Sequence, residues 1–264
     1  MLAKATRLLI PLGLLLALNT ASAHEFMIKP EKSQLNAGEA VRVEAMSSHV
    51  FMVNEEMENL SDVTLALYQG GANTPLTLHE QPQRNTLDSE VVLPQAGSAL
   101  LVGHRLAQTW SETTEGMLPG DRATLEAQGK NVINVNRYEK FAKTLLNLSA
   151  GDTTYQQVLG QKLELVLLTN PADIKGNGKI KVQALLDGQP LQSAINITYD
   201  GYSQAHDTYL ANQQSDAQGI AEFAITQPGL WLLRTGVTQS QPQPDINKYD
   251  LRATLDPIPK GIIV

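Results

Sequence analysis

Short runs of alternating apolar and polar residues, interrupted by Gly, Pro, Asn and Asp, make up most of this chain. A period of two residues is typical of half-buried β-strands, and the interrupting residues are typical of the turns between them. Helical spacing is found mainly in "NRYEKFAKTLLNL" (136–148), where Tyr138, Phe141, Leu145 and Leu148 recur at intervals of three or four. The pattern therefore predicts an all-β fold with one short helical segment.

Three strand-like segments recur in the same order in the two halves of the chain. The matched pairs are "QLNAGEAVRVEA" (34–45) with "DIKGNGKIKVQA" (173–184), "VTLALYQGG" (63–71) with "INITYDGYS" (195–203), and "EVVLPQAGSALLVGHR" (90–105) with "AEFAITQPGLWLLRTG" (221–236). Such self-similarity indicates a duplicated structural unit. We therefore expect two tandem β-sandwich domains, at 24–135 and 160–264, joined by a short helical connector at 136–159.

The first 23 residues have the order of a secretory signal peptide. Lys4 and Arg7 precede an apolar run at 8–18, and small residues follow at 21–23. The alternative is a membrane anchor, but the apolar run is shorter than the roughly 20 residues that a spanning helix needs. We predict cleavage after Ala23, export to a bacterial periplasm, and no membrane span in the mature chain.

Composition excludes several classes of function. The net charge of −7 and pI of about 5.2 leave no basic surface for nucleic acid. The chain has no cysteine, so it forms no disulfide. Zinc-protease, nucleophile-elbow and phosphate-loop motifs are all missing, which argues against hydrolase and nucleotide chemistry.

Cleavage after Ala23 makes His24 the first residue of the mature protein. Its free α-amine and imidazole Nδ1 can then close a chelate ring on one metal ion, and another histidine adds a third donor suited to Cu(II) or Ni(II). We predict a metal site at His24, His49 and His104. Amine and imidazole bind metals only when deprotonated, so affinity should fall below about pH 6.

The first half differs from the second in one long connection. Residues 46–62 replace the ten residues at 185–194, and this insertion carries potential soft and borderline ligands: Met46, His49, Met52, Glu55, Glu56 and Met57. The alternative is that methionines fill gaps in the core and the glutamates are solvated. His79 and His206 lie in polar contexts typical of surface histidines, and Trp231 alternates with leucines as a core residue does.

Four phrases carry a family resemblance: "HEFMIKP", "SSHVFMVNEEMEN", "LGQKLELVLLTNPADI" and "DAQGIAEFAITQPGLWLLR". Together they resemble a family of exported bacterial proteins with a domain of unknown function, often labelled periplasmic components of cobalt or nickel transport systems. The resemblance implies a transthyretin-like or Ig-like sandwich and a metal-related role. The chain departs from typical members at Met27, where they carry Trp.

Three functions follow from these features. The first is a non-catalytic periplasmic protein that binds nickel, cobalt or copper for uptake or homeostasis, with an inner-membrane metal transporter as partner. The second is a metal-free interaction module for a membrane partner. The third is a copper mono-oxygenase that uses the chelate at His24. The aromatic content of only 5% argues against a polysaccharide as its substrate.

Overall fold

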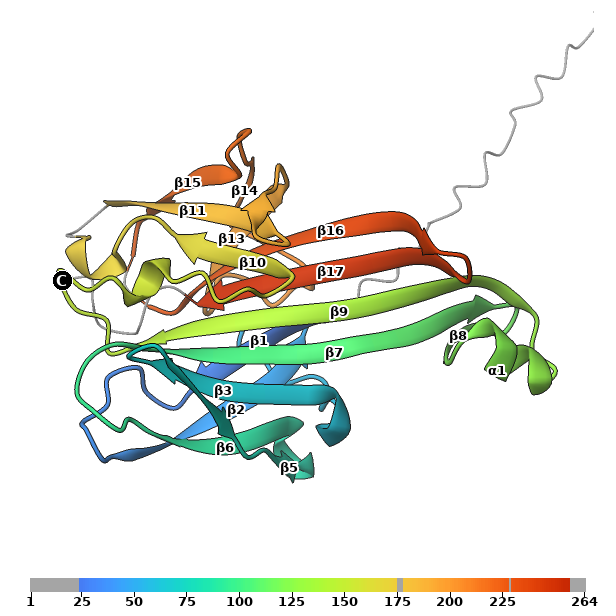
Figure 1. The fold of residues 1–264 in the computed structure, drawn as a ribbon, viewed down its shortest axis with the longest axis horizontal. Helices are drawn as coiled ribbons and strands as arrows, with labels where there is room; N and C mark the ends of the chain where they lie inside the picture. The colour runs from blue at the N-terminus through green and yellow to red at the C-terminus, as the bar shows by residue number, and fades with distance from the viewer. Residues whose placement is uncertain (1–23, 175–177, 228, 257–264) are drawn as a thin grey trace, which may run out of the picture.

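The computed structural model describes residues 24–174, 178–227 and 229–256, and in this part of the chain almost all regular structure is β-strand (Figure 1). The predicted signal peptide lies outside the described residues. The predicted all-β class is confirmed, because three sheets account for every described strand. No described helix is long and apolar enough to cross a membrane.

The largest sheet has nine strands and runs through the middle of the molecule (Figure 1). Its strands, in spatial order, are β14 (Ala211–Gln214), β13 (Ala194–Tyr199), β16 (Trp231–Gln243), β17 (Ile246–Asp256), β9 (Val132–Leu146), β7 (Ala99–Thr113), β3 (Val63–Gln69) and β4 (Ala72–Leu76), with β8 (Gly116–Pro119) added to β7. Its two halves are joined by a parallel pairing of β17 with β9, from Lys248 beside Asn136 to Asp256 beside Thr144.

Two smaller sheets complete the fold. The first contains β1 (Glu25–Pro30), β2 (Ala40–Ser48), β6 (Thr86–Val92) and β5 (His79–Gln81), in that order. The second contains β10 (Leu163–Leu167), β11 (Gly178–Leu186) and β12 (Gln189–Pro190), with β15 (Ile220–Ile225) also paired to β11. The short helices are α1 (Arg122–Ala127) and four 3₁₀ turns at Leu60–Asp62, Pro82–Arg84, Thr154–Gln156 and Pro171–Asp173.

The internal repeat seen in the sequence corresponds to a repeat of strand pairing. In the first half β1 pairs with β2, β2 with β6, and β3 with β7. In the second half β10 pairs with β11, β11 with β15, and β13 with β16, all antiparallel as in the first half. Each matched segment therefore occupies the same place in its own half, as a duplicated unit requires.

The predicted helical connector is wrong. Residues 132–146 form β9, a fifteen-residue strand between β7 and β17, and not a helix. The two sandwiches consequently share one sheet: the small sheets fall within 24–135 and 160–264, but β9 joins the two halves directly. Two lysines of this strand are buried in ion pairs, with Nζ of Lys140 at 3.2 Å from Glu58 and Nζ of Lys143 at 2.9 Å from Glu164.

Two apolar cores lie on opposite faces of the shared sheet. Successive residues of a strand point to opposite faces, and in β9 Phe141 and Leu145 join the core of the second half while Ala142 and Leu146 join that of the first. Trp231 is fully buried in the second core, as predicted. Each small sheet thus covers one face of the shared sheet and makes one sandwich with it.

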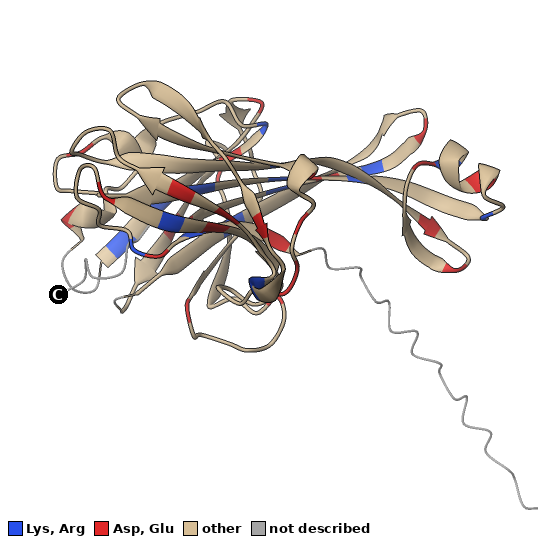
Figure 2. Ribbon diagram, turned by 90° about the horizontal axis from the view of Figure 1, so that it is seen from below, with Lys and Arg blue, Asp and Glu red and all other residues tan. Residues whose placement is uncertain are grey.

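Beyond the sandwiches, the distal parts of β7 and β9 continue as a thin arm with β8 and α1 (Figures 1 and 2). The side chain of Asp121 caps α1 by accepting the backbone N–H of Thr124 at 2.8 Å. The arm carries two exposed apolar side chains, Met117 and Ile133. It therefore offers apolar surface to solvent instead of contributing to either main core.

Asp256, at the end of β17, predicts a pH-dependent change in stability. Burial raises the pKa of this carboxyl well above its ordinary value of 3.8, against a hydrogen bond from Thr144. Between the unfolded and the raised folded pKa, the folded state holds one more proton, so Asp256 costs up to about 1.4 kcal/mol of stability per pH unit as pH rises. Asp256→Asn removes this cost and should be increasingly more stable than wild type towards neutral pH.

Urea unfolding of both proteins at several pH values between 4 and 7 measures this difference. The control is Asp245→Asn, at an exposed position, which should show no such trend. A stability difference for Asp256→Asn that does not change with pH would contradict the prediction.

Candidate metal centre

Strand register brings His24 to His49. In the antiparallel pair of β1 and β2, Glu25 lies opposite Ser48, so the residues just before β1 and just after β2 are neighbours. The centroids of the two imidazole rings are 4.1 Å apart, with the rings tilted by 38°. Two of the three predicted ligands are therefore in contact.

A third histidine joins them from the second half of the chain. The loop between β13 and β14 approaches the end of β2, and the backbone N–H of Asp207 donates to the carbonyl oxygen of His49 at 3.0 Å. This places the ring of His206 parallel to that of His49, at a centroid distance of 5.0 Å. We call His24, His49 and His206 the histidine cluster. The prediction that His206 is an ordinary surface histidine missed this association, although its ring is exposed.

Three carboxylates surround the histidine cluster. Glu56 Oε2 lies 2.8 Å from Nδ1 of His24, and Asp207 Oδ1 lies 3.4 Å from Nδ1 of His49. The carboxylate of Glu55 is shared, because one oxygen accepts the backbone N–H of His49 at 2.6 Å and the other lies 3.6 Å from Nε2 of His206. We call Glu55, Glu56 and Asp207 the carboxylate rim.

Glu56 of the carboxylate rim is charged at neutral pH. A hydrogen bond from His24 lowers the pKa of Glu56 below its ordinary 4.5, and this outweighs the opposing effect of partial burial. The positive charges of Lys140 and Arg105 act in the same direction. Negative charge beside the imidazoles favours the approach of a cation.

Buried polar contacts fix the strands that carry the histidine cluster. The carboxylate of Glu25, 3% exposed, accepts from Arg234 at 2.8 Å and from Arg252 at 3.0 Å, which holds the start of β1 against β16 and β17. On the other side, Ser47 and Glu56 exchange two backbone hydrogen bonds. His24 and Glu56 are therefore each next to an anchored backbone segment.

His104 does not lie with the histidine cluster. It is in β7, where its ring stacks on Phe141 at 4.7 Å and its Nε2 lies 2.6 Å from Glu139. The preceding residue, Gly103, faces Ile28 of β1, so alternation directs His104 to the opposite face of the sheet. The prediction that His104 supplies the third donor is corrected by this placement, which instead puts it beside an open groove of about 320 Å³.

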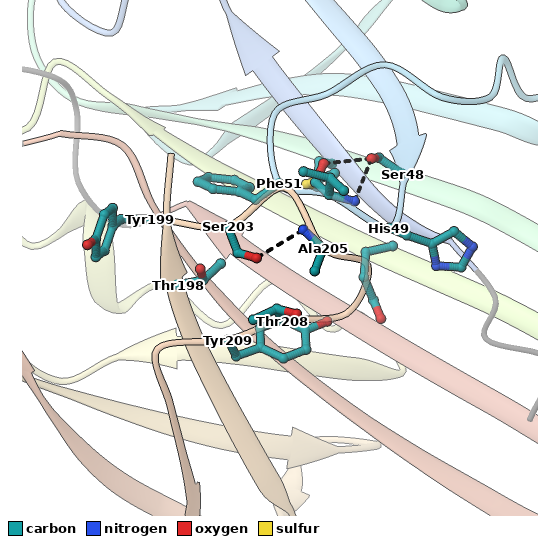
Figure 3. Close-up of a pocket in the computed structure, with 12 residues that line it drawn as sticks. Ser48, His49, Phe51, Thr198, Tyr199, Ser203, Ala205, Thr208 and Tyr209 are labelled. Carbon is teal, nitrogen blue, oxygen red and sulfur yellow. Dashed lines mark hydrogen bonds between the residues drawn. The ribbon is translucent and has the colours of Figure 1, made fainter. Parts of the chain in front are cut away.

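The methionines of the long connection pack as core residues. Met27 lies opposite Met46 in the β1–β2 pair, and with Met52 and Leu232 they form a small buried cluster. Beside it lies a cavity of about 10 Å³ (Figure 3), which is room for about one water molecule. The methionine thioethers are therefore buried core groups, and the polar donors of the site are nitrogen and oxygen.

The donor set suits a borderline transition metal, since imidazole and carboxylate bind Cu, Ni and Co. As the side chains stand, no three His, Asp or Glu side chains in the described part of the chain are arranged around a single ion. Chelation by His24 would need fewer side chains if the predicted cleavage after Ala23 occurs, because a free α-amine and the ring nitrogen would together provide two donors. Glu56 is half exposed and can turn away to free Nδ1 of His24.

Comparison with known proteins places the chain in a family. The family model described as "Domain of unknown function (DUF4198)" matches residues 21–239. The chain belongs to this family. No curated protein matches the DUF4198 chain, and the predicted role in cobalt or nickel transport stays a prediction.

Several solved structures are similar to this DUF4198 chain at low identity. The D0–D1 domain of intimin is 11% identical over 89% of this chain and 98% of its own, with a TM-score of 0.22. A DUF4785 family protein from Legionella pneumophila is 10% identical over 79% of this chain and 51% of its own, with a TM-score of 0.26. A putative membrane anchored protein from Corynebacterium diphtheriae is 13% identical over 86% and 58%, with a TM-score of 0.24. None of these likenesses bears on function.

Proposed function

We propose that this DUF4198 protein is a non-catalytic periplasmic protein that binds a nickel, cobalt or copper ion at His24 and His49 as cargo for an inner-membrane transporter. The observation that carries the proposal is the contact between the two imidazole rings, 4.1 Å apart. Export and cleavage after Ala23 supply the remaining donor, the α-amine of His24. His104 is no longer part of the proposed site.

The surroundings of the two histidines support cation binding. His24 and His49 retain partial solvent exposure, with 29% and 13% of their side chains accessible, so an ion can reach them. The ionised carboxylate of Glu56 adds negative charge at the entrance. The strands beneath are anchored, so the donors are held near one another before the ion arrives, which lowers the entropic cost of binding.

A thermal-shift screen with Ni²⁺, Co²⁺, Cu²⁺ and Zn²⁺ tests this proposal on the chain that begins at His24. An ion at a hundredfold excess over its Kd stabilises the folded state by about 2.7 kcal/mol, which raises Tm by about 5–10 °C for a domain of this size. The His49→Gln variant should lose most of that increase. An unchanged Tm with all four ions would contradict the proposal.

A second candidate function is a metal-free interaction module that contacts a membrane partner. The observation that favours it is the projecting arm, on which Met117 and Ile133 are 36% and 51% exposed. Unchanged thermal stability with every ion would leave this function in place of metal binding. The copper mono-oxygenase alternative would instead require peroxide production by the copper-loaded protein above the rate of free copper.

A further inference from the structure

We propose that His206 is a third imidazole ligand of the cargo ion, so that the ion joins the first half of the chain to the second. This inference rests on the proposed function, since it adds a ligand to the site at His24 and His49. It assigns a role to a loop of the second half, between β13 and β14.

Backbone contact places His206 within reach. The hydrogen bond from Asp207 N–H to His49 carbonyl oxygen, 3.0 Å long, fixes the loop next to the end of β2. The three rings form a row with His49 in the centre, at 4.1 Å from His24 and 5.0 Å from His206. Imidazole nitrogens bound to one ion at about 2.0–2.1 Å lie roughly 3–4 Å apart, so the proposed site requires side-chain rotation that brings these nitrogens together.

The carboxylate rim orients one of the rings, that of His49, for metal binding. A carboxylate that accepts the N–H of one ring nitrogen leaves the lone pair on the other nitrogen, which is the arrangement found around metal-ligating histidines. Asp207 contacts Nδ1 of His49, which leaves Nε2 for the ion. Glu55 lies 3.6 Å from Nε2 of His206, which is beyond hydrogen-bond distance, so it adds negative charge beside that ring without fixing its free nitrogen.

The solvent exposure of His206 fits a role of this side chain in closing the site. The side chain of His49 is 13% exposed and that of His206 is 67% exposed, so His206 is the outermost ring of the row. An outer ring can turn away to admit the ion and then turn back to bind it. The resulting set of three imidazoles and one amine is rich in nitrogen, and this predicts an affinity order of Cu²⁺ over Ni²⁺ over Co²⁺.

The experiment compares the chain that begins at His24 with its His206→Gln and His79→Gln variants. His79 is also an exposed histidine, in β5 of the first small sheet, and serves as the matched control. Calorimetric titration with Cu²⁺ or Ni²⁺ gives the affinity. Electron spin-echo spectroscopy of the Cu²⁺ form counts the coordinated imidazoles, which a merely structural role would not change.

We expect His206→Gln to weaken binding at least tenfold and to reduce the imidazole count by one, with His79→Gln like wild type. Equal affinity and an equal imidazole count in wild type and His206→Gln would overturn this inference and leave the proposed function standing. Absence of binding by wild type would overturn both. Because His206 is exposed, both variants should unfold at the wild-type temperature without metal.

Discussion

One extra residue in front of His24 is expected to lower the affinity for the cargo ion by roughly 10²–10⁴-fold, because it breaks the chelate ring. The extension turns the α-amine into a peptide N–H, which offers a lone pair only to an ion that deprotonates it, as Cu²⁺ does near neutral pH and Co²⁺ does not. Every side chain of the histidine cluster is kept. Titration calorimetry with Co²⁺ of the chain that begins at His24, and of the same chain with one preceding alanine, measures the effect.

The control for this prediction is the stability of the extended chain without metal. The start of β1 is held by Glu25 through Arg234 and Arg252, so an added residue ahead of His24 should leave Tm unchanged. Equal affinity of the two chains would show that the amine is not a ligand, and the chelate would have to be abandoned.

Lys143→Met is expected to destabilise the fold by about 3–5 kcal/mol, because it leaves the buried carboxylate of Glu164 without its counter-ion. The two side chains are 2% and 1% exposed, and Nζ of Lys143 lies 2.9 Å from Glu164. Glu164 also accepts the backbone N–H groups of Leu159 and Gly160. Loss of the lysine therefore disturbs the connection into β10 as well. Urea unfolding at neutral pH gives the change in free energy.

Lys179→Met is the matched control for this substitution. Lys179 pairs with Glu222 at 2.6 Å, but both side chains are exposed to solvent, and exposed ion pairs contribute little to stability. The control should unfold close to wild type. A Lys143→Met variant that unfolds at the same urea concentration as Lys179→Met would show that the buried pair does not support the shared sheet.

The sequence predicted the strands and their duplication because both depend on local pattern. Alternating apolar residues mark the strands, and three matched segments revealed a repeat that reappears as equivalent pairings in each half. The sharing of one sheet was not visible, since the parallel pairing of β17 with β9 joins residues more than a hundred positions apart. Pairing at that separation leaves no signal in a local period.

The helix expected at 136–148 is a strand in the structure, and the spacing of its apolar residues explains the error. A spacing of four, as between Phe141 and Leu145, puts two residues on the same side of a helix but also on the same face of a strand. A strand that is buried on both faces shows no alternation of apolar and polar residues, so its sequence pattern does not distinguish it from a helix. The buried ion pairs of Lys140 and Lys143 supplied polar residues that imitate the solvent side of a helix.

The candidate site was partly predictable. The expected cleavage point identified His24, and the long connection identified His49. Their contact could not be predicted from either feature, because it depends on the register of β1 with β2. His206 was missed because its approach to His49 is a contact between distant loops. His104 was included wrongly because its direction depends on strand alternation after Gly103.

Calorimetric titration of the chain that begins at His24 with Cu²⁺, Ni²⁺ and Co²⁺ is the direct test of metal binding at His24 and His49. One ion should bind per chain, and saturation should be lost when His49 is replaced by Gln. No binding of any of these ions, or equal binding by wild type and His49→Gln, would contradict it.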